Sequence, residues 1–176
     1  IPSGMGYDLM EDASGRIWAG TNSGSLYILG NNPGETTEVH IEAEYITTST
    51  LSPEVATLAD GRIVTISLGT GITLINPTTL QQTNIPTTNV LDDMFIPTAL
   101  RVRSNGEVWI GTRGQGLLVF NPKDESVRLK EGIHCKEIME IVEVESGDLW
   151  ISTMEGLTHW DHTSDKFHNY FASNGT

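Results

Sequence analysis

Cysteine is almost absent from this sequence. The one cysteine among the 176 residues is Cys135. A disulfide within the chain is therefore impossible, and a zinc site built from several cysteines is excluded. A lone cysteine of this kind is more often a small buried side chain than a nucleophile.

Basic residues are also scarce. The chain has 10 Lys and Arg against 23 Asp and Glu, which gives a formal net charge of −13. Nucleic acid and anionic membrane surfaces attract basic side chains, so the charge balance argues against both as partners. We interpret the acidity as a contribution to solubility. No D-x-[DN]-x-[DN]-G loop is present to suggest a calcium site.

Long hydrophobic runs are missing as well. Hydrophobic residues make up 38% of the chain, and no stretch approaches the roughly 18 consecutive apolar residues that a membrane helix needs. Apolar residues do not recur with a period of about 3.6, so we expect almost no helix. The sequence opens on Ile1 without a signal-peptide pattern, and we expect Ile1 to mark a processing or cloning boundary.

What the sequence does contain is an internal repeat. Four segments share a turn glycine, an apolar strand and a closing Thr or Ser: residues 12–21, 58–67, 103–112 and 145–153. Their turn glycines are Gly15, Gly61, Gly106 and Gly147, which lie 46, 45 and 41 residues apart. A period of roughly 40–50 residues is typical of β-propeller blades.

The repeat has a mechanical interpretation. Asp, Asn or Ser followed by Gly supplies the positive φ of a tight hairpin turn. The strand after the turn is apolar at both alternating positions, which predicts burial on both of its faces. Trp18, Trp109 and Trp150 occupy one equivalent place in this strand, with Val64 in the second repeat. That equivalence favours packing between blades over a sugar-binding platform.

Each repeat predicts four strands, of which the last is the most polar. This gradient indicates an all-β fold made of four-stranded antiparallel β-propeller blades, whose outer edge faces water. We expect one propeller segment over residues 1–176, with blades at approximately 1–45, 46–90, 91–131 and 132–176.

The number of blades bears on how the segment is completed. Seven blades at this period need roughly 300 residues, so we favour a segment of a larger, seven-bladed propeller. Self-association or further blades of the same chain would then cover its open faces. A closed four-bladed ring and one half of an eight-bladed ring remain alternatives.

Two motifs carry a family likeness. Asp-x-x-Gly-x-Ile-Trp-x-Gly-Thr at 12–21 and Asn-Gly-x-Val-Trp-Ile-Gly-Thr at 105–112 resemble the two-component regulator propeller repeat. The resemblance covers nearly the whole chain and is weakest in the second repeat, at Val64. It implies a periplasmic, extracytoplasmic sensor region of a Bacteroides-type hybrid histidine kinase, with kinase modules outside this segment. It further implies an oligosaccharide ligand and a readout through a dimer.

Signatures of catalysis and of cofactors are not found. The chain has no G-x-S-x-G elbow and no H-E-x-x-H helix, so we expect no catalytic residues, no metal and no cofactor. His159 and His162 lie near Asp161 and Asp165, and we interpret this loose group as surface side chains.

Ligands of propellers bind on loops at one face of the ring. The turn after the Trp strand of each blade supplies the ligand-binding residues that we predict: Asn22, Thr70, Arg113, Gln115 and Glu155. Arg113 replaces a small or neutral residue of the other repeats, and its guanidinium suits bidentate binding of a carboxylate.

These features predict a non-enzymatic, ligand-sensing propeller in signal transduction. Two alternatives stay open, a protein-binding scaffold and a propeller lyase or hydrolase. For the enzyme the sequence offers no cluster of His, Glu, Tyr or Arg on the loops.

Overall fold

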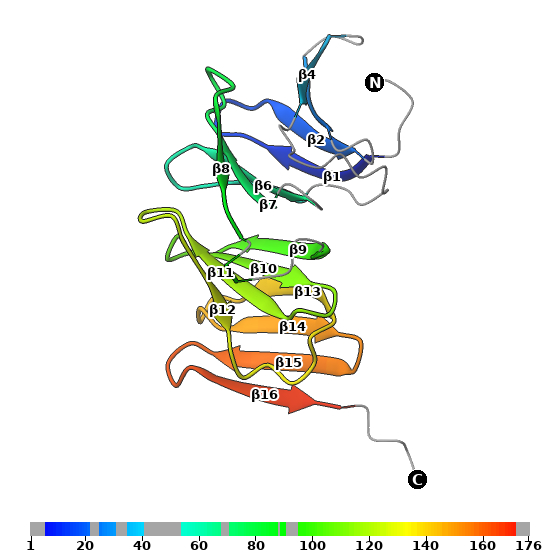
Figure 1. The fold of residues 1–176 in the computed structure, drawn as a ribbon, viewed down its shortest axis with the longest axis vertical. Helices are drawn as coiled ribbons and strands as arrows, with labels where there is room; N and C mark the ends of the chain where they lie inside the picture. Colours follow the sequence, from blue (N-terminus) through cyan, green and yellow to red (C-terminus); the bar gives the residue numbers. More distant parts are fainter. Residues whose placement is uncertain are drawn as a thin grey trace. The chain divides into compact units, whose positions relative to one another are not determined.

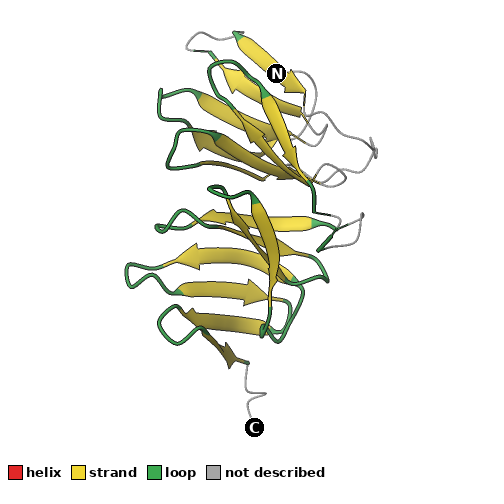
Figure 2. Cartoon of the chain, turned by 60° about the vertical axis from the view of Figure 1, so that its left-hand side comes forward, coloured by secondary structure: helices red, strands yellow, loops and turns green. Residues whose placement is uncertain are grey.

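A computed structural model of the chain describes residues 6–21, 25–30, 35–40, 54–67, 71–87, 89–90 and 95–171. The regular structure of these residues is entirely β, in four separate four-stranded antiparallel sheets (Figure 1, Figure 2). Strands pair in chain order within each sheet, which is the arrangement of a propeller blade. The predicted all-β fold with four-stranded repeats is confirmed. No helix capable of crossing a bilayer occurs in the described part of the chain.

Two compact units divide the chain, and each holds two blades. Unit 1 is Ile1–Pro97. Its blade 1 contains β1 (Gly6–Glu11), β2 (Ile17–Thr21), β3 (Ser25–Leu29) and β4 (Thr36–His40). Its blade 2 contains β5 (Glu54–Thr57), β6 (Ile63–Ser67), β7 (Gly71–Ile75) and β8 (Gln82–Ile85).

Unit 2, Thr98–Thr176, repeats the same organisation. Its blade 3 contains β9 (Pro97–Val102, whose first residue is assigned to unit 1), β10 (Val108–Thr112), β11 (Leu117–Asn121) and β12 (Ser126–Lys130). Its blade 4 contains β13 (Ile138–Glu143), β14 (Leu149–Thr153), β15 (Gly156–Asp161) and β16 (Lys166–Tyr170).

The polarity gradient across a blade follows the prediction. In blade 3, the first four residues of β11 are buried, whereas no residue of β12 is. In blade 4, no residue of β16 is buried either. Because the last strand of each blade faces water, its unpaired edge carries mostly polar side chains.

The first turn of each blade connects its first two strands and contains the turn glycine. The φ angles of Gly15, Gly61, Gly106 and Gly147 are 79°, 85°, 90° and 88°. Each of these glycines donates its N–H to the carbonyl three residues earlier, at 2.8–2.9 Å. A side chain disfavours this left-handed conformation, which explains why the four turns share a glycine.

Each blade has a trailing face and a leading face, which the register of its strands defines. The trailing face contains the Trp position of the second strand and the two third-strand positions beside it. In blade 3 it consists of Trp109, Leu117 and Val119. The leading face lies on the other side of the sheet. In blade 4 it consists of Ile141, Leu149 and Trp160.

The hydrophobic core of each unit forms where a trailing face meets a leading face. In unit 2, the trailing face of blade 3 and the leading face of blade 4 belong to one buried cluster. In unit 1, the corresponding trailing residues of blade 1 are Trp18, Leu26 and Ile28, and the leading residues of blade 2 are Val55, Ile63 and Ile75. All twelve side chains are no more than 8% exposed.

Gly111 permits the close approach of blades 3 and 4. A Cβ atom at Gly111 would lie 2.5 Å from Cγ2 of Ile138 on β13. No side chain fits at that distance, so the first strand of blade 4 packs directly against the backbone of β10.

The three equivalent tryptophans do not share one environment. Trp18 and Trp109 are 0% and 1% exposed. Trp150 is only half-buried and stacks within its own blade, with ring centroids 4.8 Å from His159 and 5.3 Å from Tyr170. Trp160, at a third-strand position of blade 4, is buried.

Candidate functional site

The first and third turns of a blade lie at the same edge of its sheet, because the chain reverses direction at each turn. At this edge of unit 2, a cleft of about 640 Å³ is lined by residues of blades 3 and 4. Its charged lining residues, apart from His162, are Arg103, Glu107, Arg128, Lys130, Glu145 and Asp165. Ser104, Asn105 and Ser146 add uncharged polar groups. Three cations and three anions therefore leave the lining close to neutral.

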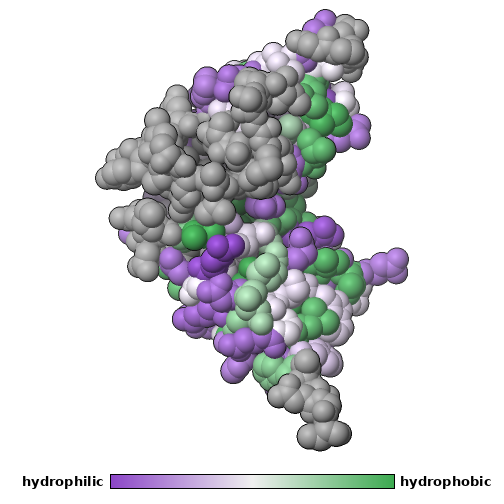
Figure 3. All heavy atoms as spheres, turned by 90° about the vertical axis from the view of Figure 1, so that its right-hand side faces the viewer, coloured by the Kyte–Doolittle hydropathy of each residue, from purple (hydrophilic) through white to green (hydrophobic). Residues whose placement is uncertain are grey.

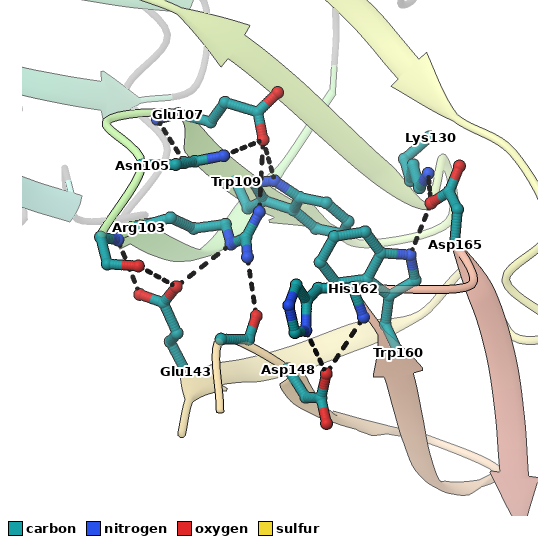
Figure 4. A network of polar contacts seen from close by, with 12 residues as sticks. Arg103, Asn105, Glu107, Trp109, Lys130, Glu143, Asp148, Trp160, His162 and Asp165 are labelled. Atoms are coloured by element: carbon teal, nitrogen blue, oxygen red, sulfur yellow. Dashed lines mark hydrogen bonds and ion pairs between the residues drawn. The ribbon is translucent and has the colours of Figure 1, made fainter. Parts of the chain in front are cut away.

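Arg103 lies at the centre of the cleft and joins the two blades. Its side chain is 6% exposed, and its Nη2 donates to the carbonyl of Gly147 in the first turn of blade 4 at 2.7 Å. The guanidinium also pairs with Glu107 and Glu143, each at 3.4 Å (Figure 4). Nε of Arg103 lies within ion-pair distance of Glu143 but has no well-aligned hydrogen-bond acceptor.

Two indole rings form the apolar wall of the cleft. The ring centroids of Trp109 and Trp160 lie 4.6 Å apart, one ring from each blade. The guanidinium carbon of Arg103 is 4.8 Å from the Trp160 centroid and 5.7 Å from the Trp109 centroid. This geometry adds cation–π attraction to the hydrogen bonds and favours one orientation of the arginine.

A second tie between the blades comes from Glu143 at the end of β13. Its carboxylate accepts hydrogen bonds from the backbone N–H and the hydroxyl of Ser104, both at 2.9 Å. Glu143 and Arg103 therefore connect the first turn of blade 3 to the first strand of blade 4 from both directions.

On the blade 3 side, the carboxylate of Glu107 accepts hydrogen bonds from several side chains. Burial raises the pKa of this carboxyl, but hydrogen bonds from Asn105 and Trp109 and the charges of Arg128 and Arg103 outweigh burial and lower it. Arg128 on β12 pairs with Glu107 at 3.1 Å and is 53% exposed. The result is an ionised acceptor paired with a half-exposed cation in the lining of the cleft.

On the blade 4 side, Asp165 is the corresponding carboxylate that binds a cation and an indole N–H. It pairs with Lys130 and accepts a hydrogen bond from Nε1 of Trp160 at 2.8 Å. The hydrogen bond from Lys130, followed by that from Trp160, lowers the pKa of the Asp165 carboxyl. Both carboxylates that face the indole rings are therefore held in the charged form.

The group best suited to hold a metal ion lies beside the cleft. Ligand atoms of Asp148, Asp161 and His162 come within 4.8 Å of one another. Asp148 accepts hydrogen bonds from the backbone N–H of His162 at 3.0 Å and pairs with its Nδ1 at 2.7 Å. The side chain of His162, the leading cause, holds the pKa of Asp148 well below its usual 3.8. Asp161 accepts hydrogen bonds from the backbone N–H groups of Thr163 and Ser164. All three residues therefore have partners within the protein, and we assign no metal to the group.

The predicted ligand-binding residues lie elsewhere. Asn22 and Thr70 fall outside the described residues. Arg113, Gln115 and Glu155 belong to the second turns of blades 3 and 4, which lie at the opposite edge of the sheets from the cleft.

These second turns are brought together by the segment that joins the two blades. Arg113 forms a backbone bridge with Glu137, and Met154 donates its N–H to the carbonyl of the same Glu137. Glu155 pairs with His134 at 3.2 Å, and both side chains are more than half exposed. Gln115 borders a cavity of only about 50 Å³.

Comparison of sequences identifies no relative of this chain: no family profile matches it, and none of the curated proteins does. Comparison of structures finds propellers. The extracellular domain of a protein from B. thetaiotaomicron described as a one-component system superposes with a TM-score of 0.74 at 18% identity, over 97% of this chain. The extracellular domain of a hybrid two-component system from the same organism gives 0.71 at 18% identity, over 97% of this chain.

An enzyme is also among the similar structures. Virginiamycin B lyase from Staphylococcus aureus, solved with quinupristin, superposes with a TM-score of 0.72 at 13% identity over 97% of this chain. The chain spans 25% and 23% of the length of the two sensor-system proteins and 56% of the lyase. At these identities the likeness establishes the β-propeller fold, which sensors and enzymes share.

Proposed function

We propose that this chain is a ligand-sensing segment of an extracytoplasmic propeller in a two-component type regulator, and that it binds an oligosaccharide without catalysis. The observation that carries the proposal is the cleft of about 640 Å³ in unit 2. Its volume falls in the range of roughly 300–1,000 Å³ that is usual for small-molecule sites.

The chemistry of the cleft suits an uncharged, hydroxyl-rich ligand. Sugar hydroxyls both donate and accept hydrogen bonds, and the lining offers donors such as Arg128 and acceptors such as Glu145. The balance of three cations and three anions gives no net attraction for a strongly charged ligand. A neutral oligosaccharide of a few rings is the ligand class that meets both conditions.

The carboxylates of the cleft support binding over catalysis. A general acid of a glycosidase needs a raised pKa, so that it holds a proton near neutral pH. The pKa values of Glu107 and Asp165 are instead lowered by their donors. Ionised at neutral pH, they accept hydrogen bonds and do not deliver protons.

The extracytoplasmic location and the signalling role are supported by the similar structures. Both sensor-system proteins were solved as extracellular domains. In the proposed system, ligand binding favours one arrangement of the sensor over another and so shifts its signalling state.

The test uses calorimetric titration of the chain with a panel of neutral and acidic oligosaccharides. We expect binding of a neutral sugar, and we expect Arg128→Ala to weaken it about tenfold, the effect of one lost charged hydrogen bond. Arg113→Ala is the matched control, since it removes an arginine of the same blade at the opposite edge.

If Arg113→Ala weakens binding and Arg128→Ala does not, the ligand binds at the second turns of unit 2, where Arg113, Gln115 and Glu155 lie. Chromatography of the mixtures should recover every sugar intact, because the proposal excludes turnover. Failure of the whole panel to bind would refute carbohydrate sensing.

A further inference from the structure

The first turn of blade 3 differs from the other three first turns in one reactive group. The residue before its turn glycine is Asn105, which is exposed and lines the cleft. The other blades have Ser14, Asp60 and Ser146 at this position. Of the four side chains, only that of Asn105 is an amide, and an asparagine followed by glycine is the pair most open to loss of that amide.

The reaction is deamidation through a cyclic imide. The backbone nitrogen of Gly106 loses its proton to water and attacks Cγ of Asn105. A bond from nitrogen to Cγ forms, the bond from Cγ to Nδ2 breaks, and Nδ2 takes up a proton and leaves as ammonia. Water then opens the ring at either carbonyl, which leaves aspartate or isoaspartate. One water is consumed for each ammonia released, and no other reactant is needed.

The surroundings of Gly106 leave room for the ring. A glycine has no Cβ to shield its backbone nitrogen from the neighbouring side chain. A Cβ atom built at Gly106 would meet no other atom within 4 Å, so nothing packs over this side of the turn. Water therefore reaches the turn, and sterics do not prevent the reaction.

Hydrogen bonds of the folded turn hold both reacting groups. The N–H of Gly106 donates to the carbonyl of Arg103 at 2.9 Å. Oδ1 of Asn105 accepts the backbone N–H of Glu107 at 3.0 Å, and its Nδ2 donates to the carboxylate of Glu107 at 3.1 Å (Figure 4). The attack needs the nitrogen of Gly106 free of its proton, so the turn must open before Asn105 reacts.

Blade 4 controls how readily this turn opens. The side chain of Arg103, whose carbonyl binds Gly106, donates to the carbonyl of Gly147 at 2.7 Å. The next residue, Ser104, donates its backbone N–H and its hydroxyl to Glu143, both at 2.9 Å. Both residues at the start of the turn are therefore bonded to blade 4, and the turn is held closed while the two blades are docked.

An acid at position 105 changes the cleft. Added negative charge is tolerated at most exposed sites, and Figure 3 shows hydrophilic (purple) atoms at several places on one face of the molecule. Position 105 is different because its amide donates to Glu107. Deamidation replaces that hydrogen bond with two carboxylates side by side, and it adds a fourth anion to the three cations and three anions of the lining.

We propose that Asn105 is a deamidation site that the docking of blade 4 protects, and that its conversion to an acid destabilises the first turn of blade 3. The modification makes the lining of the cleft net negative. It links the chemical age of the chain to the state of this cleft, whether or not the cleft binds a sugar.

The experiment follows the conversion by mass spectrometry. The chain is kept in mildly alkaline buffer and digested with trypsin at intervals, which releases residues 104–113 as a peptide with one asparagine. A synthetic peptide of the same residues gives the unprotected rate. We expect Asn105 of the folded chain to react at least about tenfold more slowly, because only the open fraction of the turn reacts. A rate equal to that of the peptide would overturn the protection.

Two glutamates of β13 test the role of blade 4. Glu143→Gln weakens a charged hydrogen bond to the turn, and we expect deamidation to become about tenfold faster. Glu140→Gln is the matched control, since this exposed residue of the same strand bonds only to the N–H of Ile141. Circular dichroism checks folding, and Ser104→Ala, measured against its own peptide, replaces Glu143→Gln if that chain does not fold. Equal rates in the test and control variants would contradict control by docking.

The effect of the acid is measured on Asn105→Asp, which reproduces one product of the reaction. Asn105→Ser is the neutral control, because blades 1 and 4 have serine at this position. We expect Asn105→Asp to unfold at a lower urea concentration than Asn105→Ser, and the difference to shrink at high salt as the repulsion from Glu107 is screened. Equal stability of the two variants at low salt would overturn the proposed effect on the turn.

Discussion

The first turns of blades 1 and 3 have the same backbone but exchange their charges. In blade 1 the buried residue is Asp12, 2% exposed, and its partner four residues on is Arg16, at 2.8 Å. In blade 3 the buried residue is Arg103, 6% exposed, and the partner is Glu107, at 3.4 Å. A tryptophan of the trailing face packs against each pair.

The sign of the buried charge decides what it binds. A carboxylate accepts hydrogen bonds, so Asp12 takes the Nε1–H of Trp18 at 2.9 Å and the backbone N–H groups of Ser14 and Arg16. These bonds stay inside blade 1, and the more exposed Arg16 donates to the carbonyl of Pro77 in blade 2.

A guanidinium has only donors, so a buried arginine must find acceptors. Arg103 finds them at Gly147 and Glu143 in the next blade, and the Nε1–H of Trp109 donates to Glu107 at 3.4 Å instead. In these two turns the buried Asp12 binds donors of its own blade, whereas the buried Arg103 also joins its blade to the next one.

Removing the buried cation should have the largest effect on stability. Arg103→Met leaves Glu143 and Glu107 without their shared partner, and we expect a loss of about 3–5 kcal/mol in the free energy of unfolding. Urea denaturation followed by tryptophan fluorescence measures it. Arg128→Met, at an arginine that is 53% exposed, should cost at most about 1 kcal/mol. Equal losses from the two variants would contradict the role given to Arg103.

Neutralising the buried anion should have an intermediate effect. Asp12→Asn keeps an acceptor for Trp18 but loses the charge opposite Arg16, and we expect a cost of about 1–3 kcal/mol near neutral pH.

The effect of Asp12→Asn should depend on pH. Burial raises the pKa of Asp12, but the hydrogen bonds from Trp18, Arg16 and Ser14 outweigh it and hold the pKa below its usual 3.8. The stabilisation by the carboxylate is therefore complete above about pH 4 and is lost as pH falls through the lower pKa of the folded state. Denaturation at a series of pH values should show wild type and variant converging in acid, and a constant difference would argue against an ionised Asp12.

The first turn of blade 2 should be the least sensitive, because Leu58 holds the position of Asp12 and Arg103. Its ion pair, Arg62–Asp60 at 2.7 Å, is exposed at both ends, at 32% and 49%. We expect Arg62→Ala to cost at most about 1 kcal/mol, and less at high salt. A cost in thermal unfolding as large as that of Asp12→Asn would show that burial does not set the order.

The turns and strands could be predicted from the sequence because their causes are local. A glycine at positive φ, such as Gly106, and a strand that is apolar on both faces leave a signal within ten residues. The period of the repeat then fixed the fold class, since four copies of one hairpin pattern indicate blades.

The cleft could not be predicted in the same way. Lys130 and Asp165 come from parts of the repeat with no shared motif, and their meeting depends on how blade 4 packs on blade 3. Arg103 had a detectable signal, since the position three residues before the turn glycine holds Asp12, Leu58, Arg103 and Val144 in the four repeats. An ionised residue at a position that is apolar in other repeats indicates a buried polar network, and the sign of its charge suggests where the partners lie.

The partial exposure of Trp150 could not be predicted from the repeat for a different reason. The pattern assigns one role to Trp18, Trp109 and Trp150, but burial depends on what covers the trailing face of each blade. In the described part of the chain that cover is present for the first two and absent for the third.

The indole pair of unit 2 gives the molecule an optical reporter. Trp109 and Trp160 come from different blades, with centroids 4.6 Å apart and ring planes at 48°. Two chromophores so close couple their electronic transitions, and the coupling falls steeply as they separate. The circular dichroism of this pair therefore senses whether blades 3 and 4 are docked, without any label and in any solution where the protein can be measured.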